Sequence, residues 1–547
     1  MSSRIVDAPE AVHTGLVVLD GIGLGVADVV RLADGTARPV PGADAMKRVT
    51  ESWDAARQIA ATGRVYGRST GVGANRNEDV PTEAAAEHGL RLLRSHAGAI
   101  GDELPSRQVR AMLAVRANQL LAGGAGLRPT VVTALCEALE NGAYPVVNEF
   151  GSVGTGDIAA LAQVGLALAG EHPWRASGTG AGAGGPSGGL GERAFGGSTD
   201  AHGSAAAGAA GSVAVGATGF TAVGAPDPQA LDNNDALAFI SSNALTLGQS
   251  ALALHELRGL IEATQVVAAL SLLAVDGSHE AYAAPVHAAR PHRGSARVAR
   301  RMRELIGAAD RPTPPLGRIQ DPYGFRCLPQ IHGPAHDAAD ALEEVLAIEI
   351  NAAAENPLIS PEDMAAYHHG GFYQAQLALA LDHFRLALTQ VARLSTSRLS
   401  TLNEPAYTRL RPFLADHEPA SSGVMILEYA AGAALGDLRA FSAPASLGHA
   451  VLSRGVEEQA SFASLAARQT VRACRAYRLV VGCELVAAVR ALRQRDLRPD
   501  PDLPVGRALR LADSVLQEDQ ADRPLTDDVT AAAALLDRFT DIWRGSE

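Results

Sequence analysis

Lysine is almost absent from this chain of 547 residues. Lys47 is the only one, and every other basic side chain is arginine. Pyridoxal enzymes hold their cofactor as a Schiff base on a lysine. Because Lys47 lies in an ordinary amphipathic stretch, we expect no pyridoxal chemistry. Basic residues are also outnumbered: 47 Lys and Arg stand against 60 Asp and Glu, a net charge of −13. Nucleic acids and anionic membranes attract clustered positive charge, so we expect neither as a partner.

Cysteine and long apolar runs are scarce too. The four cysteines, Cys136, Cys327, Cys474 and Cys483, show no CxxC pairing. They predict buried thiols rather than a disulfide framework or a zinc site, and we expect no metal. The sequence begins without an apolar signal segment, and no later run has the length and hydropathy of a membrane span, which predicts a cytoplasmic protein.

Aromatic residues make up only 4% of the chain, whereas apolar residues make up 47%. Ala, Leu and Val recur at helical spacing and predict an all-α fold. The expected helices are 83–98, 106–123, 129–142, 157–170, 231–274, 335–352, 373–399, 421–441 and 456–494. Long Ala-rich helices without a heptad seam are typical of a buried long-helix bundle whose remaining apolar faces pack against other subunits. We therefore expect an obligate oligomer.

Composition divides the chain into three parts. We predict an N-terminal helical domain over 1–230, a central long-helix bundle over 231–495 and a C-terminal helical segment over 496–547. Residues 172–225 are rich in Gly, Ala and Ser and have no period. Such a tract buries too little apolar surface to offset its ordering entropy, so it predicts a flexible surface insertion.

A glycine-rich turn, EFGSVGTGD (149–157), precedes one predicted helix. Its glycines permit backbone conformations that other residues avoid, and Asp157 is a good N-cap. Free N–H groups and the positive end of the helix dipole suit developing negative charge there. The turn lacks the endings of a P-loop or a dinucleotide-binding motif. A purely structural loop is the alternative.

Two further segments carry candidate chemistry. In RVYGRSTGVGANR (64–76), Tyr66 could act as a general base if positive charge or a helix N-terminus depresses its pKa; otherwise it is a packing tyrosine. In GRIQDPYGFRCLPQIHG (317–333), Gln320, Tyr323 and Arg326 are three residues apart and share one side of a helical turn. Arg326 could clamp a carboxylate, or it is an ordinary surface arginine.

In IEINAAAENPLI (348–359), Asn351 and Asn356 are either helix caps or polar site groups.

In their order and spacing these segments resemble the aromatic amino-acid ammonia-lyase and aminomutase family, and most of all its histidine ammonia-lyases. The resemblance runs from about Val17 to about Leu536. Further matching segments are LLRSHAGAIGDELP (92–105), VRAMLAVRANQLLAGGAGLRP (109–129), ARPHRGSARVARRM (289–302) and EEQASFASLAAR (457–468). The family relation implies long near-parallel helices and a homotetramer whose active sites draw on three subunits.

The resemblance also implies a reaction. Family members make an electrophilic methylidene-imidazolone from an Ala-Ser-Gly triad in their own backbone, by cyclisation and loss of water. The electrophile attacks the substrate, a tyrosine removes a β-proton, and ammonia leaves an α,β-unsaturated acid. Aminomutases return the amine to the β-carbon.

This chain departs from the family at that triad. The family sequence GSVGASGD corresponds here to GSVGTGD, one residue shorter. Either Gly154-Thr155-Gly156 replaces the triad, and the threonine methyl would hinder attack, or the triad has shrunk to Thr155-Gly156 and no ordinary ring closes. We therefore expect no methylidene-imidazolone and no other cofactor.

At other active-site positions of the family, this chain either replaces or retains the family's residue. Ser241 stands where the family has an asparagine, Val456 replaces a glutamine, and GFYQAQ (371–376) keeps Phe372 but loses the following HGEP. The positions that match family active-site residues are Tyr66, His96, Gln320, Tyr323, Arg326, Asn356, Phe372 and Glu457. His96 with Glu457 resembles the histidine-specific arrangement, or it is an inherited polar pair in a core that no longer catalyses.

The resulting hypothesis is a lyase-like enzyme of specialised metabolism that acts on a histidine-like or other amino-acid derivative without the usual electrophile. Its catalytic residues would be Tyr66, Gly154, Thr155, Gly156 and Tyr323. Its substrate-binding residues would be His96, Ser241, Gln320, Arg326, Asn356, Phe372 and Glu457. The alternatives are a conventional ammonia-lyase or 2,3-aminomutase with a Thr155-derived electrophile, and an inactive homologue with a binding role.

Overall fold

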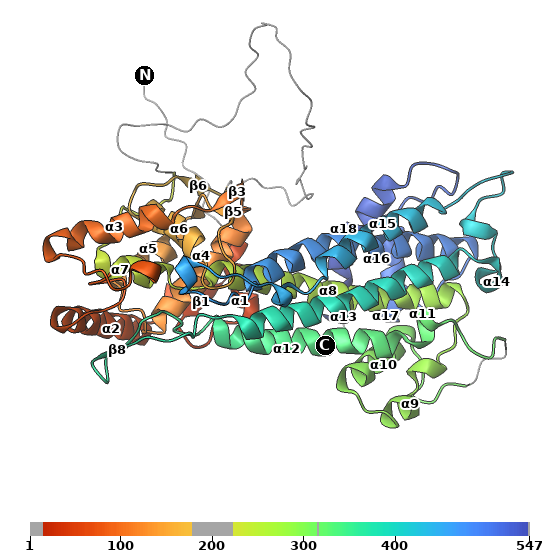
Figure 1. Ribbon diagram of the computed structural model, residues 1–547. Helices are drawn as coiled ribbons and strands as arrows, with labels where there is room; N and C mark the ends of the chain where they lie inside the picture. Colours follow the sequence, from red (N-terminus) through yellow and green to blue (C-terminus); the bar gives the residue numbers. More distant parts are fainter. Residues whose placement is uncertain (1–14, 178–221, 314–316, 545–547) are drawn as a thin grey trace, which may run out of the picture.

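The computed structural model describes residues 15–177, 222–313 and 317–544 and is mainly helical (Figure 1), which confirms the all-α prediction. Most of the predicted insertion, residues 178–221, lies outside the described residues. Its first residues are not a loop, because strand β6 (Trp174–Ala176) begins there and pairs antiparallel with β4 (Ala143–Pro145).

The N-terminal part, on the left in Figure 1, packs short helices with small two-stranded sheets. Its remaining elements are β1 (Leu16–Leu19), α1 (Val26–Ala33), β2 (Arg38–Pro41), α2 (Ala43–Thr62), α3 (Ala85–His96), β3 (Ile100–Glu103), α4 (Ser106–Leu121), α5 (Pro129–Glu140), β5 (Asn148–Phe150), α6 (Ile158–Leu168) and α7 (Asn233–Ile240). Strands β1 and β2 pair in parallel, and β3 pairs antiparallel with β5.

The rest of the chain forms a bundle of long helices that cross the molecule from left to right in Figure 1. Its elements are α8 (Ala244–Ala274), α9 (Ala284–Ala288), α10 (Arg293–Ile306), α11 (Tyr323–Arg326), α12 (Leu328–Glu349), α13 (Ala375–Leu402), α14 (Pro405–Thr408), α15 (Ile426–Phe441), α16 (Ala463–Gln494), α17 (Pro504–Asp513), α18 (Thr526–Phe539) and α19 (Asp541–Arg544). Strands β7 (Leu358–Ser360) and β8 (Ala365–Tyr367) pair antiparallel and pack against α2 of the N-terminal part. Helix α8 packs against α16, α12 and α13. One hydrophobic core extends through both parts of the molecule.

The two longest predicted helices, 231–274 and 456–494, are both shorter in the structure than the sequence predicts. The first breaks at 241–243, between α7 and α8, and the second begins only at Ala463 rather than at 456. At the first break the amide of Asn243 donates to the carbonyl of Phe372 at 2.7 Å, and the carbonyl of Ser242 accepts from Asp157 N–H at 2.7 Å. These polar groups bind other segments, so the helix does not continue through them.

The stretch 233–274 is long and apolar enough to cross a membrane by length and composition, contrary to the expectation that no run would be. Within the molecule, 78% of its most apolar window is buried, which is typical of a core helix. Cys136, Cys474 and Cys483 are buried as predicted, whereas Cys327 is partly exposed.

Candidate active site

A cavity of about 710 Å³ lies where the N-terminal part meets the beginnings of the long helices. Seven of the predicted site residues line it: Tyr66, Thr155, Gly156, Ser241, Asn356, Phe372 and Glu457. They come from loops far apart in the sequence, and both breaks in the overlong predicted helices contribute to its wall through Ser241 and Glu457. The fold thus assembles most of the predicted site within one chain.

The glycine-rich turn is held by hydrogen bonds from a distant segment. Gly154 and Gly156 have φ of 90° and 119°, which only glycine adopts without strain. Ser461 Oγ donates to the carbonyl of Gly154 at 2.8 Å, and Ser152 Oγ donates to the carbonyl of Gly156 at 2.9 Å. A Cβ added at Gly154 would lie 2.2 Å from Ser461 Oγ and 2.8 Å from the backbone nitrogen of Phe462. Gly154 therefore occupies a position with no room for a side chain.

Asp157 stands at the predicted N-cap position of α6, but its carboxylate does not cap that helix. It accepts hydrogen bonds from Thr246 N–H at 2.8 Å and from Thr246 Oγ1 at 2.9 Å instead. Burial raises the pKa of this carboxyl group, while the bonds from Thr246 oppose the rise. Asp157 therefore ties the turn to the first residues of α8.

Tyr66 is half-buried in the cavity wall, where its hydroxyl oxygen accepts a hydrogen bond from Gly73 N–H at 2.8 Å. Burial raises the pKa of the phenol above its ordinary value, and Glu457 adds to the rise, outweighing Gly73 and Arg76. The condition of a depressed pKa is not met within this chain, because burial of the ring outweighs the stabilisation of a phenolate by nearby positive charge.

Ser241 and Asn356 are two polar residues that also line the cavity. Ser241 Oγ accepts from the backbone N–H of Asn356 at 3.0 Å, and Asn356 Oδ1 accepts from the backbone N–H of His369 at 3.0 Å. His369 Nε2 contacts the carbonyl of Glu355 at 2.7 Å, and its Nδ1 accepts from Gly371 N–H at 2.8 Å. This network fixes the loop that carries Phe372 into the cavity.

Three predicted residues lie far from the cavity in this chain. Gln320 precedes α11, and Tyr323 and Arg326 belong to it, with the Arg326 guanidinium over the Tyr323 ring at 4.4 Å. Helix α11 packs near the end of α13, where Arg398 Nη1 donates to the carbonyl of Gly324 at 3.3 Å. Phe372 lies three residues before the start of α13, and the helix from Ala375 to Arg398 measures about 35 Å. Figure 1 shows α11 at the right end and the cavity elements at the left.

His96 is also not among the residues that line the cavity. Its Nδ1 lies 2.9 Å from the carbonyl of Leu92 and 3.0 Å from Ser95 Oγ, so it is bonded to its own helix. No His96–Glu457 hydrogen bond forms within the described residues of this chain.

Sequence reasoning missed six polar or aromatic residues that line the cavity: Arg76, Ser242, His368, Tyr373, Glu458 and Gln459. Arg76 lies in the same glycine-rich segment as Tyr66, and the other five lie within a few residues of Ser241, Phe372 or Glu457. Proximity in sequence to those residues was the available signal. In an aromatic-poor chain, three aromatic rings at one cavity, those of Tyr66, Phe372 and Tyr373, mark a binding site.

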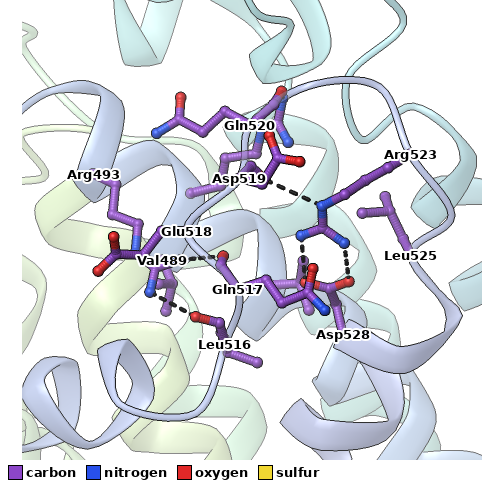
Figure 2. Close-up of a pocket in the computed structure, with 12 residues that line it drawn as sticks. Val489, Arg493, Leu516, Gln517, Glu518, Asp519, Gln520, Arg523, Leu525 and Asp528 are labelled. Carbon is purple, nitrogen blue, oxygen red and sulfur yellow. Dashed lines mark hydrogen bonds and ion pairs between the residues drawn. The ribbon is translucent and has the colours of Figure 1, made fainter.

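A second hollow lies in the loop between α17 and α18 (Figure 2). Its arginines are already paired: Arg523 binds Asp528 at 2.6 and 2.8 Å, and Arg493 donates to the carbonyls of Leu516 and Gln517 at 3.0 and 2.7 Å. This hollow therefore anchors the loop. Across the parts of the chain that the structure describes, no group of three or more His, Cys, Asp or Glu side chains is placed to hold a metal ion.

Comparisons with known proteins agree with the geometry. The family described as "Aromatic amino acid lyase" matches residues 24–513. Histidine ammonia-lyase of Geobacillus thermodenitrificans is 31% identical over 95% of this chain and 97% of its own, and that of Sorangium cellulosum is 32% identical over 95% and 97%.

Solved structures share the fold. Histidine ammonia-lyase from Trypanosoma cruzi superposes with a TM-score of 0.81 at 24% identity, covering 97% of this chain and 94% of that one. The ergothioneine-degrading enzyme of Treponema denticola superposes with a TM-score of 0.82 at 24% identity, covering 96% and 99%. The chain is thus a lyase that belongs to the aromatic amino acid lyase family.

Proposed function

We propose that this lyase eliminates an amine from a histidine-like amino-acid derivative without a backbone-derived electrophile. The observation that carries the proposal is the turn at Gly154–Gly156, which is one residue shorter than the family's triad and leaves no room for a Cβ at Gly154. The catalytic groups are Tyr66, which donates a hydrogen bond from its phenol, and the turn itself, whose backbone faces developing negative charge.

The leaving group must then depart without electrophilic activation. A quaternary ammonium does so, because it leaves as a neutral tertiary amine. The cavity suits such a cation: the carboxylates of Glu457 and Glu458 supply negative charge, and the rings of Phe372 and Tyr373 offer faces for cation–π contact. The Treponema denticola enzyme is described as degrading ergothioneine. We assign this chain a substrate of the same chemical class, a trimethylammonium betaine, in specialised metabolism of the cytoplasm.

A second copy of the chain completes the site in this proposal. Arg326 and Tyr323 lie about 35 Å from the cavity along α13. Tyr323 is 65% exposed and Arg326 is partly exposed, so another subunit can contact both. A homotetramer lets one subunit bring Gln320, Tyr323 and Arg326 to the cavity of another, where Arg326 holds the substrate carboxylate.

The first experiment combines mass spectrometry with an assay. We expect the peptide spanning Thr155 to have its unmodified mass, and the enzyme to release trimethylamine and a conjugated acid from a histidine betaine but no ammonia from histidine. A deficit of two waters at Thr155, together with ammonia release, would support the conventional ammonia-lyase instead. Betaine binding without turnover would support the inactive homologue.

The second experiment tests the shared site. We expect Tyr66→Phe to lower kcat at least about 10²-fold, and Arg326→Met to raise KM. Co-expressed in equal amounts, the two impaired variants should form mixed tetramers in which about a quarter of the sites have both native residues and native kinetics. If the two residues acted within one chain, the mixture would recover nothing.

A further inference from the structure

Two turns from distant parts of the chain meet beside the cavity. The tyrosine turn, residues 69–80, follows Tyr66, and the glutamate turn, residues 452–457, ends at Glu457. Each is closed by backbone hydrogen bonds across an antiparallel pair of residues. Because Tyr66 and Glu457 both line the cavity, the contact between the two turns bears on how these side chains are placed.

One hydrogen bond joins the two turns. Ala74 N–H donates to Ser453 Oγ at 3.0 Å, and within the described residues no other hydrogen bond links one turn to the other. The preceding amide, Gly73 N–H, donates to the Tyr66 hydroxyl at 2.8 Å. Two successive amides of the tyrosine turn therefore hold the phenol on one side and the glutamate turn on the other.

The shapes of both turns fit this close contact. Gly73 has a φ of 56°, and a Cβ added there would lie 2.5 Å from Ser453 Oγ, so only glycine allows the approach. In the glutamate turn, Ser453 and Arg454 have φ of 50° and 55°, in the left-handed region that non-glycine residues rarely adopt. Strain of this kind persists where surrounding contacts hold it, and it is typical of functional sites.

We propose that Ser453 is a positioning residue, whose hydrogen bond from Ala74 sets the place of the Tyr66 hydroxyl relative to Glu457. The inference rests on the proposed function, in which the phenol and the carboxylate act on the same substrate. Both groups must hold their places closely, since a misplacement of about 1 Å lowers a rate about 10²-fold. Ser453 is not among the residues that line the cavity, so it acts through the tyrosine turn.

The test replaces Ser453 with glycine. Ser453→Gly removes the accepting oxygen but also relieves the left-handed strain, so we expect the midpoint of denaturant unfolding to be unchanged or slightly higher. We expect kcat to fall about 10–10²-fold. Ser453→Asn keeps an acceptor oxygen, and asparagine tolerates the left-handed conformation, so this variant should retain more of the native kcat. A Ser453→Gly variant with native kcat would overturn the assignment.

Hydrogen exchange in the ligand-free enzyme provides a second readout. Measured by mass spectrometry, peptides that cover the tyrosine turn should exchange faster in Ser453→Gly than in the wild type, because Ala74 N–H has lost its acceptor. The control is Ser514→Gly, which removes a hydroxyl bond to the carbonyl of Leu511 at an exposed position in the bundle. It should leave both kcat and exchange in the tyrosine turn unchanged. Unchanged exchange in Ser453→Gly would also overturn the assignment.

These readouts separate this inference from the proposed function. We measure kcat with whichever substrate the wild-type enzyme turns over, a histidine betaine or histidine itself. Release of ammonia from histidine overturns the proposed leaving group, while a loss of kcat in Ser453→Gly still supports the positioning role. If neither substrate is turned over, the proposed function fails; faster exchange then supports the contact between the turns, and unchanged exchange excludes it.

Discussion

The two ends of α13 differ in how their charged groups are satisfied. Near its C-terminal end, Arg398 and Glu484 are fully buried and paired at 2.6 and 2.8 Å, and Ser271 and Ser395 donate to the same carboxylate at 2.7 and 2.6 Å. Beyond its N-terminal end, Glu457, Glu458 and His368 line the cavity, and no hydrogen bond or ion pair engages their side chains within the described residues.

This difference separates stability from binding. A buried charge without a partner destabilises the fold, and at the bundle end Arg398 and Glu484 satisfy each other internally. At the cavity end, the side chains of Glu457, Glu458 and His368 are instead available to bind a ligand. The positions that depart from the family, Ser241, Thr155 and Val456, gather at the cavity end. The reaction can therefore change there while the bundle is preserved.

The largest expected effect is at the bundle end. Arg398→Met should lower the free energy of unfolding by about 3–5 kcal/mol, because it leaves Glu484 buried without its partner. Denaturant unfolding at fixed protein concentration measures the change. As a control, Arg300→Met removes an exposed pair with Glu304, 3.6 Å apart, and should cost less than about 1 kcal/mol. Equal losses in the two variants would contradict the contrast between the ends of α13.

A smaller effect depends on pH. Burial lowers the pKa of His336, in the bundle, to about 3, below the ordinary value of 6.5 that applies in the unfolded chain. As pH falls below 6.5 the unfolded chain takes up a proton that the native state does not, so stability falls. For this group the loss between pH 8 and pH 5 is about 2 kcal/mol.

Replacing His336 tests this contribution. His336→Gln should flatten the dependence of unfolding free energy on pH over that interval. A wild-type stability that does not fall between pH 6.5 and pH 5 would show that other titrating groups offset the buried imidazole.

The smallest effect on stability is expected at the cavity end. Ser461→Ala removes the hydrogen bond to the carbonyl of Gly154 and should cost about 1 kcal/mol. It should lower kcat by a larger factor than this cost implies, because the turn that faces the reacting atoms loses its support. The control, Ser397→Ala, removes a bond within α13 at an exposed position and should leave kcat unchanged. Loss of stability with native kcat would show that the turn is only structural.

Local patterns predicted much of the fold. Alanine- and leucine-rich periodicity located α4, α5, α6 and α13 to within a few residues, since these helices bury apolar faces along their whole length. The same periodicity failed at 241–243 and at 456–462, where it continued the helix. At those points tertiary hydrogen bonds from Asn243 and Phe462 override the local preference.

Candidate residues were likewise found by pattern, but their roles were not. Tyr66 lies in the cavity as predicted. The sign of its pKa shift depends on burial by distant segments, which no local motif encodes. His368 escaped notice because a free and a bonded histidine in HHGG look alike until the partners of His369 are known.

The sequence by itself determined the family and the helical class, because these depend on residue order and spacing. Only the tertiary structure decided that Gly154 has no room for a side chain, since the obstruction comes from Ser461 and Phe462, about 300 positions later. It also decided that Tyr323 and Arg326 lie at the far end of α13 from the cavity. The length of a rigid helix, rather than any motif, sets that separation.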